Sequence, residues 1–209
     1  MPAITTCFIG ACQACLAAPD PAVECRHPAC GLSRLDSPRI PATARVERRP
    51  RHYAHSVSAE GSQGWMACTD RLRLRLLRVE DAVPLREIAD AGWVEALASR
   101  PGDRTLTPWA IVLRGSGAVV GFCGFFARPV KGTTMGYAIV PQFRGQGLAT
   151  EAAAAVLDWA ERHGVDVYAS IRPPNPASAR VLEKIGMWRV GSYRDGDGRR
   201  DIYRRRRAS

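Results

Sequence analysis

The residues most able to do chemistry form a short turn, Gln142-Phe143-Arg144-Gly145-Gln146-Gly147, which runs into an alanine-rich segment, residues 148–160. The first N–H groups of a helix have no partner within it, and the aligned peptide dipoles leave partial positive charge there. Glycines at 145 and 147 carry no Cβ, so a phosphate can approach the main chain closely. The spacing predicts an anion-binding turn, although a strand, a glycine turn and a packing helix without a ligand give the same pattern.

The turn needs a strand before it and a helix after it, and the sequence supplies both. Residues 134–140 are suited to a strand, Ala152 to Ala155 favour a helix, and Gly164 is suited to the C-terminal cap of that helix. Residues 165–171 follow as another strand. This strand, helix, strand order predicts a right-handed crossover between locally parallel strands.

The other elements are predicted to be mostly antiparallel. Alternating arginine and leucine over residues 71–76 indicates a half-buried strand, and residues 79–98 are expected to form one or two helices, separated at Gly92. Residues 109–113 with 119–126, and residues 187–193 with 201–205, predict hairpins, and residues 177–184 predict a helix. The expected fold class is α/β (α+β), with a mixed, mostly antiparallel central sheet of about six to seven strands flanked by helices.

Composition narrows the classes of partner. The 209-residue chain carries a net charge of +10, from 30 lysines and arginines against 20 acidic residues. A basic surface suits a polyanionic cofactor as well as nucleic acid, and the lack of a nucleic-acid motif argues against the latter. No stretch approaches the about 20 apolar residues of a membrane span, and no secretory leader is evident. We expect a cytoplasmic protein with no membrane association, and its oligomeric state is left open.

Residues 1–66 differ in composition from residues 67–209, which are predicted to form the domain. The first segment is rich in proline, alanine and cysteine without a sustained period, which predicts a disordered extension or a start misplaced upstream of Met66. A zinc knuckle is the alternative, with ligands drawn from Cys12, Cys15, Cys25, His27 and Cys30. Because Cys25 and Cys30 are separated by four residues, which is irregular for such a site, we expect no metal.

Two sequence elements carry a resemblance to a known superfamily. The turn matches (Gln/Arg)-x-x-Gly-x-(Gly/Ala), and Asn175-Pro176-Ala177-Ser178 precedes Val181-Leu182-Glu183-Lys184-Ile185-Gly186-Met187 downstream. Together with the order of elements, the turn resembles that of the GNAT superfamily of acetyl-CoA-dependent N-acetyltransferases. The second element resembles the ribosomal-protein alanine acetyltransferase-like branch. The similarity covers about residues 72–203, and neither a GxxxxGK[ST] loop nor a strand-opening GxGxxG is present.

The resemblance implies a binding mode for acetyl-CoA. Its pyrophosphate is expected on the turn, and its pantetheine arm between the strands at residues 134–140 and 165–171, bonded to backbone as an added strand would be. The residues that the resemblance assigns to the cofactor are Ala138, Ile139, Val140, Gln142, Arg144, Gly145, Gln146, Gly147, Ala149, Thr150, Asn175 and Ser178.

Acyl transfer to an amine also needs a deprotonated amine, a donor for the oxyanion and a proton for the departing thiolate. We expect the Val140 backbone N–H to be the oxyanion donor and Ser178 to position or protonate the sulfur. Many family members have a tyrosine seven residues after the motif asparagine, where this chain has Leu182. The candidates for the base are Glu80, Glu95 and Glu151. A chain of ordered waters is the alternative to all three.

The function expected from these features is acetyl-CoA-dependent N-acetylation of a primary amine. An N-terminal amine of a protein or peptide is the favoured acceptor. A small-molecule amine acceptor and a non-catalytic acyl-CoA-binding regulatory module are the alternatives.

Overall fold

The computed structural model describes residues 65–101, 106–126, 133–196 and 198–205. The cysteine and histidine residues of the alternative zinc site lie outside these ranges. Within the described part, no group of three or more histidine, cysteine or acidic side chains could hold a metal ion. No helix in these ranges is long and apolar enough to cross a membrane.

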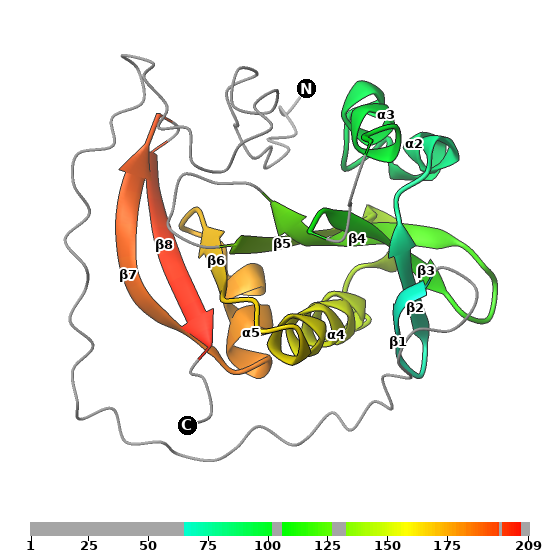
Figure 1. Cartoon of the computed structure of the whole chain (residues 1–209). Coiled ribbons are helices and arrows are strands. Elements are labelled where there is room, and N and C mark those ends of the chain that lie inside the picture. The colour runs from blue at the N-terminus through cyan, green and yellow to red at the C-terminus, as the bar shows by residue number, and fades with distance from the viewer. Residues whose placement is uncertain (1–64, 102–105, 127–132, 197, 206–209) are drawn as a thin grey trace.

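One sheet of eight strands forms the centre of the described domain (Figure 1), in the order β1-β2-β3-β4-β5-β6-β8-β7. The strands are β1 Trp65–Cys68, β2 Leu72–Leu76, β3 Pro108–Leu113, β4 Val119–Phe126, β5 Thr133–Ile139, β6 Val167–Ile171, β7 Met187–Asp195 and β8 Gly198–Arg205. Neighbouring strands are antiparallel except β5 and β6, which are parallel across the crossover. The mixed, mostly antiparallel sheet expected from the sequence is confirmed, with one strand more than the upper expectation.

The additional strand is β1, which pairs with β2 through Ala67 opposite Leu74 and begins at Trp65. Its four residues are too few to show a period. The sheet thus begins at Trp65, two residues before the domain boundary at residue 67 that composition suggests.

Helices cover both faces of the sheet (Figure 1). Helices α4 Leu148–Arg162 and α5 Pro176–Lys184 lie on one face, while α2 Ala82–Leu85 and α3 Ala91–Ala98 lie on the other. Two short 3₁₀ turns, η1 Val79–Asp81 and η2 Pro141–Phe143, precede α2 and α4. The larger core lies beneath α4, where the ring of Trp109 meets that of Trp159 edge-on at 5.2 Å between centroids. Such pairs add stability beyond the area that they bury.

The helical segment before β3 divides at a different place from the one expected. Gly92 lies inside α3 and does not separate two helices, so that expectation is wrong. The break precedes Asp90, whose carboxylate accepts the N–H of Trp93 at 3.2 Å and caps α3. The aspartate cap defines the start of α3, and a single glycine inside a helix is not enough to end it.

Candidate active site

The glycine turn lies where β5 ends and α4 begins. Gly145 and Gly147 adopt φ angles of 77° and 78°, the left-handed region that favours glycine. Gln142, Arg144 and Gln146 are exposed in the turn. Ala149 and Thr150 belong to the first turn of α4, whose 15 residues align their peptide dipoles toward this end. A Cβ built on Gly145 would meet no atom within 4 Å, so there is open space beside this glycine.

Strands β5 and β6 separate beside the turn. They pair at Thr133 with Val167 through Met135 with Ala169, and the register stops there although β5 continues to Ile139 and β6 to Ile171. The last residues of β6 pair instead with β8 on their other side. The C-terminal half of β5 therefore has a partner strand only on its β4 side.

The backbone groups that face this gap follow from the ladder with β4. The N–H of Val140 donates to the carbonyl of Val120 at 2.9 Å, so these residues form a hydrogen-bonded pair. Because such pairs alternate along antiparallel strands, Ala138 also bonds toward β4, whereas Tyr137 and Ile139 direct their N–H and C=O groups toward β6. The gap is thus lined by backbone groups of Tyr137 and Ile139.

This ladder corrects the expected oxyanion donor. The Val140 N–H is already used within the sheet and cannot donate to a ligand in the gap. The ladder also uses the backbone of Ala138, which removes it from the set of expected pantetheine contacts. Ile139 remains an expected pantetheine contact. Its carbonyl accepts the Arg144 Nε–H at 2.8 Å, so the Arg144 side chain points back toward β5.

Helix α5 brings the second motif to the same gap. Asn175 caps this helix, its side-chain oxygen accepting the Ser178 N–H at 3.0 Å. The Ser178 carbonyl in turn accepts the hydroxyl proton of Tyr137 at 3.1 Å, which joins β5 to the first turn of α5. Burial raises the pKa of the Tyr137 phenol above its usual range. Strand alternation places Tyr137 on the face of Met135 and Ile139, toward α4 and α5.

A family model described as the acetyltransferase (GNAT) domain matches residues 71–188. The chain belongs to this family. The match includes the turn, both strands of the gap and the whole of α5.

Relatives of this acetyltransferase domain include YkkB of Bacillus subtilis (strain 168), which is 38% identical over 84 residues, 38% of this chain and 49% of that protein. The chain spans about half the length of the curated relatives it matches. A solved GNAT-family acetyltransferase from Bacillus anthracis has a TM-score of 0.55 at 22% identity, covering 64% of this chain and 93% of that one. Ribosomal-protein-S5-alanine acetyltransferase from Vibrio fischeri has a TM-score of 0.52 at 15% identity, covering 65% and 93%. These structural likenesses show the fold.

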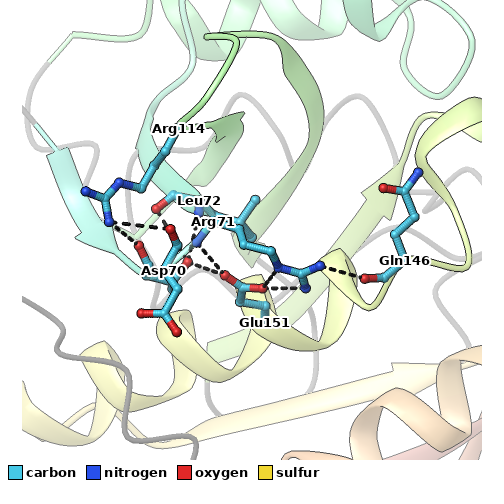
Figure 2. Close-up of polar contacts among 7 residues, drawn as sticks. Asp70, Arg71, Leu72, Arg114, Gln146 and Glu151 are labelled. Carbon is cyan, nitrogen blue, oxygen red and sulfur yellow. Dashed lines mark hydrogen bonds and ion pairs between the residues drawn. The ribbon is translucent and has the colours of Figure 1, made fainter.

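The three carboxylates considered as the base differ in their surroundings. Glu151 is buried in the first turn of α4 (Figure 2), with its oxygens taken by Thr69 and Arg71. It therefore has a structural place and is a poor candidate for a base. Glu80 is exposed in η1 and pairs with Arg78 at 3.9 Å, and Glu95 is exposed on α3.

The position seven residues after Asn175 is part of the core of the acetyltransferase domain. Leu182 is fully buried among apolar side chains, so no hydroxyl reaches the gap from this turn of α5. The Tyr137 phenol, on β5, instead contacts the first turn of α5 through the Ser178 carbonyl. The sequence motifs do not include Tyr137, although alternation along residues 133–139 predicts that its side chain lies on the same face as Met135 and Ile139.

Proposed function

We propose that this acetyltransferase transfers an acetyl group from acetyl-CoA to a primary amine, with an N-terminal amine of a protein or peptide as the acceptor. The observation that carries the proposal is the opening of β5 from β6 directly beside a glycine turn at a helix N-terminus. An extended amide-containing arm can add to β5 there as a strand would, while its pyrophosphate lies on the turn.

The residues present fit this cosubstrate. The two positive-φ glycines and the N-terminus of α4 suit an anionic pyrophosphate, and the backbone of Ile139 and Tyr137 matches the amides of a pantetheine arm. Bound acetyl-CoA supplies the thioester carbonyl that a neutral amine attacks and the thiol that departs. Arg144 can exchange its bond to the Ile139 carbonyl for the phosphate, because its side chain is exposed beside the turn.

The revised candidate for the oxyanion donor is the backbone N–H of Tyr137. Ile139 is nearer to the turn along β5, so an arm extending from the pyrophosphate meets Ile139 first and Tyr137 next. A preorganised N–H at the second position stabilises charge that develops on a carbonyl oxygen there. The Ser178 side chain, half-buried in the first turn of α5, is the hydroxyl assigned to the departing sulfur.

Two features support a peptide acceptor. The segment from Asn175 to Met187 resembles the ribosomal-protein alanine acetyltransferase-like branch, and one structural neighbour is named a ribosomal-protein-S5-alanine acetyltransferase. The test is thiol release from acetyl-CoA with peptides that carry a free N-terminus, the same peptides blocked at the N-terminus, and small alkyl and aromatic amines. Release with free peptides alone supports the proposal. Release only with small amines favours a small-molecule acetyltransferase, and binding without release favours a regulatory module.

The Tyr137 hydroxyl is expected to affect turnover more than cofactor binding. Tyr137→Phe keeps the ring in the core but removes the bond to the Ser178 carbonyl that orients the first turn of α5. We expect kcat to fall about tenfold and KM for acetyl-CoA to change less than about twofold. The control is Tyr168→Phe on β6, which keeps the ring beneath Arg204. An unchanged kcat in Tyr137→Phe, measured by initial rates, would contradict the expectation that the bond from Tyr137 to the Ser178 carbonyl supports turnover.

The pH dependence of kcat/KM should identify the kind of amine. Only a neutral amine attacks, so kcat/KM should rise about tenfold per pH unit and level off at about pH 8 for a peptide N-terminus, against about pH 10 for a lysine-like amine. Burial raises the pKa of both Tyr137 and Cys123, so both groups keep their protons between about pH 7 and 10 and do not change the slope of the pH profile there. A profile that still rises at about pH 9 with peptides contradicts an N-terminal acceptor.

A further inference from the structure

Arg71, which directly precedes β2, reaches across to the glycine turn (Figure 2). Its Nε and Nη2 groups contact Oε2 of Glu151 at 2.7 and 2.6 Å, and its Nη1 donates to the backbone carbonyl of Gln146 at 3.0 Å. One guanidinium thus contacts two points at the start of α4: the side chain of Glu151 in its first turn, and the carbonyl of Gln146, the residue between the two positive-φ glycines.

The carboxylate that receives Arg71 is itself fixed. Oε1 of Glu151 accepts the Thr69 hydroxyl at 2.5 Å and the Arg71 backbone N–H at 3.1 Å. The Glu151 side chain is 4% exposed, whereas that of Arg71 is 50% exposed. Both oxygens of this buried carboxylate have donors, so Glu151 connects Thr69 and Arg71 to α4 while half of the Arg71 side chain stays exposed.

The bond to Gln146 also determines where the next N–H points. In a trans peptide the C=O and the following N–H lie on opposite sides, so a Gln146 carbonyl held toward Arg71 directs the Gly147 N–H away from Arg71. Gly147 follows this peptide and Gly145 lies one residue before it, and glycines at both positions would otherwise allow many orientations. Fixing one orientation before the ligand arrives lowers the entropy that binding must remove.

Arg71 has an electrostatic effect at the same place. Glu151 is the fourth residue of α4, and an uncompensated carboxylate there would oppose an anion at the helix N-terminus. The bidentate pairing with Arg71 offsets this charge. The turn therefore keeps the positive potential of the helix end despite a buried acid in its first turn.

We propose that Arg71 is a positioning residue for the pyrophosphate of coenzyme A: it orients the Gln146–Gly147 peptide and neutralises Glu151. This inference rests on the proposed function, since it assumes that coenzyme A is the ligand of the turn. It predicts that the loss of Arg71 weakens ligands that contain the pyrophosphate and leaves ligands without it unchanged.

The test compares full-length wild-type protein with Arg71→Met and Arg71→Lys, and with Arg73→Met as the matched control. Arg73 lies on β2, two residues after Arg71, and its guanidinium carbon is 5.2 Å from the centroid of the Trp65 ring. Calorimetry measures the dissociation constants of coenzyme A and pantetheine, and hydrogen exchange without ligand measures the amides of residues 145–149. We expect Arg71→Met to weaken coenzyme A about tenfold or more, to change pantetheine less than about twofold and to speed exchange in the turn. Arg71→Lys should give an intermediate loss, since lysine cannot make the bidentate pair.

The outcomes separate this inference from the function on which it rests. Wild-type protein that binds no coenzyme A overturns the proposed function, and the inference with it. If wild type binds coenzyme A, equal losses for coenzyme A and pantetheine in Arg71→Met overturn the inference alone. Unchanged exchange in the turn, or a loss in Arg73→Met as large as that in Arg71→Met, also overturns it.

Discussion

Gly145→Asp is expected to weaken coenzyme A binding by at least about 100-fold, because it places a carboxylate where we propose that the pyrophosphate binds. Position 145 has a φ of 77° and open space around a built Cβ, so a small side chain fits without a clash. Aspartate and asparagine are the non-glycine residues that best tolerate this conformation. Two like charges about 4 Å apart repel by about 4 kcal/mol at an effective dielectric constant of 20, which more than accounts for such a loss.

Gly145→Asn is the matched control because asparagine has the same shape and no charge. We expect its dissociation constant for coenzyme A, measured by calorimetry, to lie within about fivefold of wild type. Equal losses in the two variants would mean that the backbone conformation, and not the charge, limits binding. Wild-type affinity in Gly145→Asp would place the pyrophosphate somewhere other than on this turn.

Asp81→Ala is expected to have the largest effect on stability. Asp81 is 2% exposed and accepts two bonds from Arg75, at 2.7 and 2.8 Å, and one from the Arg78 backbone N–H at 2.8 Å. The side chain of Arg75 is 11% exposed, so removal of its partner leaves a buried and uncompensated charge. Breaking a buried pair in this way costs about 3–5 kcal/mol of the free energy of unfolding. Urea unfolding of wild type and Asp81→Ala measures the loss.

The double variant Arg75→Met with Asp81→Leu tests the reason for that loss. Replacing both charges removes the unpaired group, and the free energy of unfolding should then recover to within about 1–2 kcal/mol of wild type. If the double variant is as unstable as Asp81→Ala, the capping of η1 by Asp81 carries the stability, and the buried-charge explanation is wrong.

Local patterns predicted much of the fold. Alternation located β2, the glycine spacing located the entrance to α4, and the expected strand at residues 119–126 coincides with β4. The glycine turn and the Asn175 motif, together with the order of elements, were sufficient to predict the family. These features depend on neighbours a few residues apart, which periodicity and turn chemistry report directly.

The remaining errors arise from interactions that local patterns do not contain. The Val140 N–H is used because the β4–β5 register pairs it with Val120, and register depends on which residues meet across two strands. Glu151 was a candidate for the base, but its oxygens are taken by partners about 80 residues away in the chain. Tyr137 likewise meets the Ser178 carbonyl only when α5 packs against β5.

The most direct test of the central claim is a crystal structure of the full-length protein with coenzyme A. We predict that the pyrophosphate contacts the N–H groups of the turn at Gly145 to Ala149, and that the pantetheine arm bonds to the backbone of Tyr137 and Ile139 in the gap between β5 and β6. Arg71 should keep its bonds to Glu151 and Gln146 in the complex. A ligand bound elsewhere, or an arm that leaves the backbone of Tyr137 and Ile139 untouched, would contradict the account.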